Sequence, residues 1–197
     1  MPGMLPPELI LASTSRYRAE LLRRLRLPFS QQAPGSDETP LAGEAPAALA
    51  QRLALAKARA VAARHPQAWV IGSDQVCACG GQLLGKPGSR ASAIGQLRML
   101  SGNSAQFATA LALVHGASGR AFEALDLTTV RFRQLDAAQI ERYVEAEPSF
   151  DCAGSFKSEG LGIALCAAIE SQDPTALVGL PLVALCGLLR RAGIELP

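Results

Sequence analysis

The segment from Ala68 to Val76 constrains the fold more than any other part of the chain. Its first residues, Ala68–Ile71, are apolar and favour a buried strand. Gly72 then lets another group approach the backbone closely, or marks a bulge. Asp74 follows between apolar neighbours, where an ionised carboxylate is costly unless a cation or a proton compensates it. The segment therefore predicts a buried strand that ends near a carboxylate, which is either structural or part of a functional site.

The composition narrows the class of protein. The chain has 197 residues, of which 49% are hydrophobic, enough for one large domain or two small lobes around a shared cleft. The net charge of +2 is too small to indicate nucleic-acid binding. No apolar run reaches the roughly 18 residues that a membrane span needs, and residues 1–7 lack the pattern of a secretory signal. We expect a soluble, cytoplasmic protein with neither nucleic acid nor a membrane as its partner.

The cysteines and histidines are too few, or too scattered in the sequence, to form a disulfide framework, a zinc site or a histidine-based catalytic site. The five cysteines form no CxxC pair, which argues against a disulfide framework and a zinc ribbon. With only His65 and His115 in the chain, a Ser-His-Asp triad has almost nothing to work with. If the protein is an enzyme, its chemistry depends on carboxylates, lysines and arginines.

The N-terminal part predicts a strand over Leu9–Ala12, a hydroxyl-rich turn, and a helix over Arg16–Leu25. Arg16 and Arg18 fall in the first turn of that helix, where the helix dipole disfavours positive charge. A bound anion would remove the conflict, so this region is a candidate phosphate cradle. The alternative is a pair of solvated arginines.

Two further segments supply charged candidates. Residues 30–44 predict a loop that carries the carboxylate pair Asp37 and Glu38, which suits Mg²⁺ or hydrogen bonding. A helix then runs from Pro46 until just before Pro66, with Lys57 on or beside its apolar stripe. Such a lysine usually extends to water; the alternative is a lysine directed into a cleft.

A hairpin is predicted directly after Asp74. Gly80 and Gly81 are typical of a two-residue turn between short strands. The returning strand would bring Lys86 back towards Asp74. Lys86 would then compensate the carboxylate or form a catalytic pair with it.

The remaining segments complete an α/β pattern. An aspartate cap with Gln139 three residues later marks the start of a helix that ends near Glu147. The other predicted elements are a helix over 91–100, strands over 106–114, 123–132 and 163–169, and a last helix from Leu180 that stops at Gly193.

In this order the segments resemble the Maf family of nucleoside triphosphate pyrophosphatases. The matching segments span nearly the whole chain: LASTSRYRAELL (11–22), DE (37–38), LALAKA (53–58), VIGSDQV (70–76), LGKP (84–87), SGN (101–103), VRFR (130–133), EP (147–148), AGSFKSEGLG (153–162) and VGLPL (178–182). The STSRY, SDQV and FKSEG variants resemble the branch that acts on 7-methyl-GTP. The branch that acts on dTTP and UTP carries a different residue after the aspartate, and Gln in place of Glu159.

The resemblance implies a fold and an activity. The fold is one elongated, two-lobed α/β domain over residues 1–197, with a bent mixed sheet flanked by helices and a central cleft. The activity is hydrolysis between the α- and β-phosphates, which converts 7-methyl-GTP to 7-methyl-GMP and diphosphate and removes a modified nucleotide from the pool. A divalent cation (Mg²⁺ or Mn²⁺) and a homodimer are implied as well.

The resemblance also implies roles for nine residues. Asp74 takes the position of the proton acceptor, with Lys57 and Lys86 beside it as catalytic residues, and Glu38 and Asp74 take the metal positions. Ser13, Tyr17, Arg18, Gln75 and Glu159 take substrate-binding positions, and Tyr17, Gln75 and Glu159 are the ones associated with the choice of base. Arg16 departs from the family pattern, in which most members have proline.

The chemistry of the base explains two of these roles. Methylation at N7 makes guanine cationic, and an aromatic face such as that of Tyr17 attracts a cation. Glu159 suits the adjacent N1 and N2 donors of guanine. From its spacing to Leu21, Tyr17 is alternatively a core aromatic. Two rival functions stay open: a dTTP or UTP pyrophosphatase, and a non-catalytic nucleotide-binding regulator of cell division.

Overall fold

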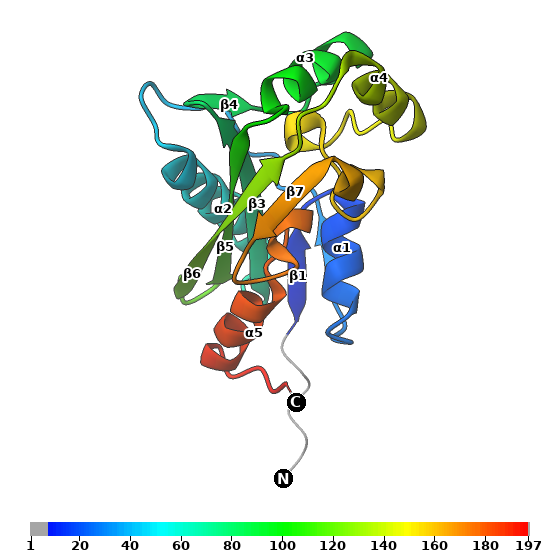
Figure 1. Cartoon of the computed structure of the whole chain (residues 1–197). Coiled ribbons are helices and arrows are strands. Elements are labelled where there is room, and N and C mark those ends of the chain that lie inside the picture. Colours follow the sequence, from blue (N-terminus) through cyan, green and yellow to red (C-terminus); the bar gives the residue numbers. More distant parts are fainter. Residues whose placement is uncertain (1–7, 197) are drawn as a thin grey trace.

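The structure is a computed structural model that describes residues 8–196, so the predicted lack of a secretory signal in residues 1–7 lies outside the described residues. Over this range the chain forms seven strands and five α-helices (Figure 1). The strands are β1 (Leu9–Ala12), β2 (Ser30–Gln32), β3 (Trp69–Cys79), β4 (Gln82–Leu84), β5 (Ser104–His115), β6 (Ala121–Phe132) and β7 (Cys166–Glu170). The helices are α1 (Arg16–Arg23), α2 (Pro46–Ala62), α3 (Arg90–Leu100), α4 (Ala137–Ala146) and α5 (Leu182–Arg191).

The strands form one open, mixed sheet in the order β2-β1-β3-β5-β6-β7, with β4 paired to β3 outside this path. β1 runs parallel to β2 and to β3, and the other pairs are antiparallel. Helices flank the sheet (Figure 1). The predicted α/β class and mixed sheet are therefore confirmed.

A gap in the pairing of β3 decides where a site can form. On one side, β1 pairs with residues 69–71 of β3, and β4 pairs with residues 77–79. Between them, residues 72–76 have a strand neighbour only in β5. One edge of β3 is thus unpaired over residues 72–76. Side chains from both faces of the sheet can reach this unpaired edge.

One face of the sheet is covered by α2. A Cβ on Gly72 would collide with the carbonyl oxygen of Ala54 and the backbone of Ala58, so only glycine allows this helix to lie so close to β3. The predicted close approach at Gly72 is confirmed. Val70 and Ala110 belong to the apolar cluster beneath α2.

The opposite face carries two apolar clusters with polar residues between them. α1 and α5 cover one end of the sheet, and α3 and α4 the other (Figure 1). Between the clusters, Ser73, Thr109 and Thr128 are buried, and each hydrogen-bonds within the chain. The described chain thus has two packed ends and a polar middle.

Several predicted boundaries differ from the structure. β3 does not end near Asp74 but continues to Cys79, because β5 pairs with its polar residues and β4 with residues 77–79. Ser30–Gln32, predicted as loop, is an edge strand held by β1. The strand expected over 163–169 begins only at Cys166, because Leu161–Leu165 form a 3-10 turn.

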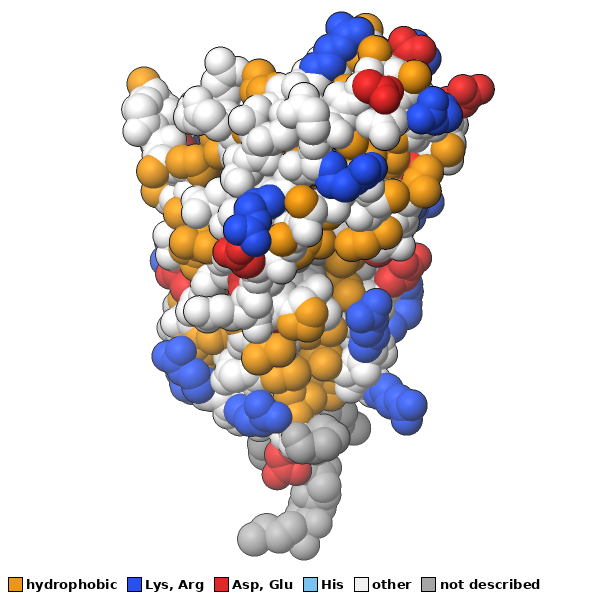
Figure 2. All heavy atoms as spheres, viewed as in Figure 1, with side chains coloured by type: hydrophobic (Ala, Val, Ile, Leu, Met, Phe, Trp, Pro, Cys, Tyr) orange, Lys and Arg blue, Asp and Glu red, His pale blue; other side chains and the backbone are white. Residues whose placement is uncertain are grey.

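Two local predictions are confirmed. Gly80 and Gly81 turn the hairpin with φ of 55° and 80°, and Asp136 and Gln139 form a reciprocal capping box at α4. The five cysteines are free. No helix within residues 8–196 is long and apolar enough to cross a membrane. On the face seen in Figure 2, basic, acidic and apolar side chains are intermingled.

Candidate active site

A cavity of about 870 Å³ opens at the unpaired edge of β3. Its wall includes the turn after β1, the start of α1, the loop before α2, the segment after β4, and the loop that carries Glu159. All nine residues to which the family resemblance assigns roles line this one cavity: Ser13, Tyr17, Arg18, Glu38, Lys57, Asp74, Gln75, Lys86 and Glu159. Asp37 does not line it, and its carboxylate accepts from Thr39 instead.

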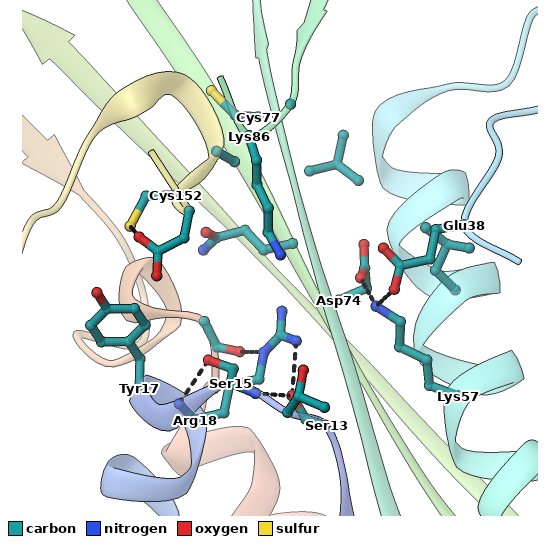
Figure 3. Close-up of a pocket in the computed structure, with 18 of the residues that line it drawn as sticks. Ser13, Ser15, Tyr17, Arg18, Glu38, Lys57, Asp74, Cys77, Lys86 and Cys152 are labelled. Atoms are coloured by element: carbon teal, nitrogen blue, oxygen red, sulfur yellow. Dashed lines mark hydrogen bonds and ion pairs between the residues drawn. The ribbon is translucent and has the colours of Figure 1, made fainter. Parts of the chain in front are cut away.

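Lys57 is the most enclosed charge in the cavity. It projects from α2 and is only 5% exposed. Its Nζ lies 2.5 Å from Oδ1 of Asp74 and 2.7 Å from Oε1 of Glu38 (Figure 3). The lysine therefore points into the cleft, and the alternative of a lysine extended to water is wrong.

The carboxylates around Lys57 differ in exposure. Asp74 is buried in the middle of β3, whereas the Glu38 side chain is 56% exposed on its loop. Partial burial favours the neutral form of Glu38, but the hydrogen bond and charge of Lys57 outweigh it, so the pKa of Glu38 lies below its ordinary value. The charges of Lys86 and Arg18 act in the same direction. Glu38 is therefore ionised at neutral pH.

Arg18 lies in the first turn of α1, just after β1, and hydrogen bonds hold its side chain in place. Its Nε donates to the carbonyl of Gly179 at 2.9 Å, and Nη1 donates to Oγ of Ser13 at 3.5 Å. Oγ of Ser15 caps α1 by accepting from the Arg18 N–H. Burial lowers the pKa of Arg18, and the charges of Asp74 and Glu38 oppose this shift. Arg18 is thus held against the cavity wall, whereas Arg16 lies exposed.

Lys86 enters from the segment that follows β4. Figure 3 shows its side chain directed into the cavity towards the region of Arg18 and Asp74. Lys86 is exposed, and its side chain forms no hydrogen bond or ion pair with another residue of the described chain. The predicted return of the hairpin towards Asp74 is confirmed.

Gln75 lies on the opposite face of β3 from Asp74. Its Nε2 donates to Oγ1 of Thr109 and to the carbonyls of Ala176 and Leu177, at 2.9 to 3.1 Å. The amide nitrogen is therefore committed to the protein, and the carbonyl oxygen is the polar atom that Gln75 can offer to a ligand.

Tyr17 and Glu159 both line the cavity. Tyr17 accepts a 2.7 Å hydrogen bond from Nη2 of Arg16, whose guanidinium lies 4.8 Å from the ring centroid. Because Tyr17 faces the cavity, the alternative of a core aromatic is wrong. Glu159 is exposed, and Oγ of Ser158 at 3.4 Å is its hydrogen-bond donor in the described chain.

Some residues that hold the site residues in place could not be identified from the sequence. The carbonyl of Gly179 accepts from Arg18 and also from Oγ of Ser73 at 3.0 Å. Gly179 adopts a φ of 115°, where a side chain would be strained. The VGLPL motif, which contains Gly179, was the available signal. Residue types alone do not show that a backbone carbonyl accepts hydrogen bonds from distant side chains. Glu147 and Lys157, which form an ion pair beside Tyr17, were missed as well.

The carboxylates of Glu38 and Asp74 could hold a divalent cation only if a bound ligand supplied further oxygen donors. Among residues 8–196, no group of three or more His, Cys, Asp or Glu side chains could hold a metal. Glu38 and Asp74 nevertheless meet at Lys57, each through one oxygen, and the second oxygen of each carboxylate accepts no hydrogen bond in the described chain. Two carboxylates completed by phosphate oxygens are a donor set that Mg²⁺ accepts. The residues thus fit a cation that arrives with a polyphosphate.

Comparisons with known proteins agree with this geometry. A family model described as Maf-like protein matches residues 8–192. A protein of Xanthomonas oryzae pv. oryzae (strain MAFF 311018) named 7-methyl-GTP pyrophosphatase is 61% identical over 97% of this chain and 100% of its own length. Proteins of the same name from Pseudomonas aeruginosa and Alcanivorax borkumensis are 53% and 51% identical, each over 97% of this chain and over 100% and 97% of their own lengths. On this evidence the chain belongs to the Maf family.

Proposed function

We propose that this chain hydrolyses 7-methyl-GTP at the bond between the α- and β-phosphates, giving 7-methyl-GMP and diphosphate. The observation that carries the proposal is the convergence of Arg18, Lys57 and Lys86 with Asp74 and Glu38 in one cavity. Three cations suit a polyphosphate, and a carboxylate in their midst suits the activation of water. The relatives named 7-methyl-GTP pyrophosphatase support the choice of substrate.

In the proposed reaction the cations bind and orient the triphosphate. Arg18 offers a planar donor fork, and Lys86 a mobile point charge. Both neutralise phosphate oxygens and stabilise the charge that develops on the leaving diphosphate. A divalent cation, Mg²⁺ or Mn²⁺, supplies further charge neutralisation when it is bound by Glu38 and Asp74.

Asp74 is the proposed general base. Its Oδ1 is paired with Lys57, and Oδ2 accepts no hydrogen bond within the described chain. A water molecule that gives its proton to this carboxylate forms a new bond to phosphorus as the bridging P–O bond breaks. The diphosphate departs with the electron pair of that bond. A positioned base of this kind contributes roughly 10²- to 10⁴-fold to a rate.

Tyr17 and Glu159 are the proposed contacts to the base. The ring of Tyr17 stabilises the cationic 7-methylguanine by stacking, an effect of roughly 0.5 to 2 kcal/mol. Glu159 accepts from the N1 and N2 donors of the same ring. Neither contact favours uracil, which lacks both the charge and the N2 donor.

A substrate panel tests the proposal. Diphosphate release is measured for 7-methyl-GTP, GTP, dTTP and UTP, with Mg²⁺, with Mn²⁺ and with a chelator. The expected result is the highest kcat/KM for 7-methyl-GTP and loss of turnover without a divalent cation. Higher kcat/KM for UTP or dTTP would instead identify the pyrimidine branch, and binding without turnover would identify a regulator.

Three finer points belong to the same proposal. We propose that the chain acts in the cytoplasm on the free nucleotide pool, without nucleic acid or a membrane as its partner. Residues 1–197 act as one domain, and the protein is a homodimer. Light scattering coupled to size-exclusion chromatography tests the oligomeric state directly.

A further inference from the structure

Glu147, at the end of α4, contacts both ends of the short loop from Lys157 to Leu161. Its Oε1 lies 2.8 Å from Nζ of Lys157, and its Oε2 accepts the Leu161 N–H at 3.0 Å. The hydroxyl of Tyr143 accepts from the Lys157 N–H at 3.2 Å. The loop from Lys157 to Leu161 is therefore anchored to α4 at both ends, and Glu159 lies between the anchors.

Glycine at position 160 is part of this arrangement. A Cβ there would collide with Oε2 of Glu147, so the carboxylate lies directly against the loop backbone. The hydrogen bonds from Lys157 and from the Leu161 amide hold the pKa of Glu147 below its ordinary value. Glu147 is thus negatively charged at neutral pH.

The same ion pair lies beside the proposed base contact. Nζ of Lys157 is 5.7 Å from the centroid of the Tyr17 ring. A lone ammonium at this position would repel a cationic base stacked on Tyr17, but would affect a neutral base much less. The carboxylate of Glu147, 2.8 Å from this ammonium group, offsets its charge.

We propose that Glu147 is a specificity-determining positioning residue: it cancels the charge of Lys157 beside Tyr17 and holds the loop that presents Glu159, and so favours a cationic base over a neutral one. The inference rests on the proposed function. It concerns the choice between 7-methyl-GTP and GTP, which differ by one methyl group and one positive charge.

The decisive variant is Glu147→Gln, which keeps an acceptor oxygen but removes the charge. The expected result is a fall of about tenfold in the ratio of kcat/KM for 7-methyl-GTP to that for GTP, with the loss in KM rather than in kcat. The double variant Glu147→Gln/Lys157→Met removes both charges, and we expect it to recover most of the ratio. Glu145→Gln, an exposed residue on the same helix, is the matched control and should leave the ratio unchanged.

The outcomes separate the inference from the proposed function. Equal losses for both nucleotides in Glu147→Gln, or no recovery in the double variant, would overturn the inference while the wild-type preference stands. A wild-type protein that hydrolyses neither nucleotide overturns the proposed function. Equilibrium binding of the two nucleotides to the same variants still tests the inference in that case, because the charge effect acts on binding.

Thermal unfolding of each variant tests whether an altered nucleotide ratio results from a general loss of stability. A midpoint within about 4 °C of the wild-type value corresponds to a stability change of roughly 1 kcal/mol for a chain of this size. A preserved midpoint together with an altered nucleotide ratio supports a specific role for Glu147.

Discussion

The two ends of the cavity are built in different ways. At the end that we propose binds phosphate (the phosphate end), Lys57 and Asp74 come from a helix and a central strand, and both are buried. At the end that we propose binds the base (the base end), Glu159 is exposed on a loop, and the side chains of the Glu147–Lys157 ion pair are about one-fifth exposed. Packing fixes the first group, whereas a few side-chain contacts fix the second. Changes at the phosphate end should therefore lower the rate for every nucleotide, and changes at the base end should alter the choice among nucleotides.

The largest effect is expected for Asp74→Asn. The amide cannot accept the proton of the attacking water, so kcat should fall by at least about 10²-fold for all nucleotides. Nucleotide binding should persist, because the side chains of Arg18, Lys57 and Lys86 remain. Steady-state kinetics and equilibrium binding on the same preparation check both points. Turnover close to that of the wild type would remove Asp74 from its role.

Lys57→Met tests the contrast in burial between the two ends. Removing one partner of a buried pair leaves an uncompensated charge, so the free energy of unfolding should fall by roughly 3 kcal/mol. Lys157→Met breaks the partly exposed pair at the base end and should cost less than about 1 kcal/mol. Denaturant unfolding of the two variants gives the comparison, and equal losses would contradict it.

A double variant sharpens that result. Lys57→Met/Asp74→Asn removes both buried charges, so it should regain much of the stability that Lys57→Met loses. If the double variant is less stable than either single variant, the Lys57–Asp74 contact is not the source of the loss.

Glu159→Gln should change the choice of base with little effect on stability. The ratio of kcat/KM for 7-methyl-GTP to that for UTP is expected to fall by about tenfold, the size of one lost charge-assisted contact. Glu145→Gln again serves as the control for a change of one charge. An unchanged ratio in Glu159→Gln would exclude Glu159 from base recognition.

The smallest effect concerns the loop that carries Glu38. Arg52 donates to both carboxylate oxygens of Glu44, at 2.6 and 2.7 Å, and to the carbonyl of Thr39. The Arg52 hydrogen bonds and the Leu41 N–H lower the pKa of Glu44 from 4.5 to about 2. Its contribution to stability is therefore present above pH 4.5 and is lost as the pH falls towards 2.

This pH dependence is measurable. Between pH 4.5 and about 2, the thermal midpoint of the wild type should fall slightly more steeply than that of Glu44→Gln, which has no carboxylate to protonate. Parallel curves for the two proteins would show that the Arg52–Glu44 contact does not stabilise the folded chain.

Much of the fold follows from local sequence. Gly72 marked the close approach of α2, and Asp136 with Gln139 marked the start of α4, because both signals act through the backbone beside them. β2 could not be predicted in this way. Its sequence Ser30-Gln31-Gln32 lacks the apolar alternation of a strand, and its pairing comes from β1, which is distant in sequence.

The site shows the same division. The charges around Asp74 were recognisable as residue types, and the family resemblance placed them in one region. The residues that hold these charged side chains in place were not recognisable, because their role depends on contacts between segments that are distant in the sequence. The Gly179 carbonyl that orients Arg18 is 161 residues away, and the Glu147 carboxylate contacts a loop that the sequence shows only as punctuated by glycines.

Product analysis tests the central claim most directly. 7-Methyl-GTP is incubated with the wild-type protein and a divalent cation, and the products are separated and quantified. A cavity that binds the polyphosphate and directs water at the α–β bond should give 7-methyl-GMP and diphosphate in equal amounts. Release of orthophosphate with 7-methyl-GDP, or recovery of unchanged nucleotide, would contradict the account.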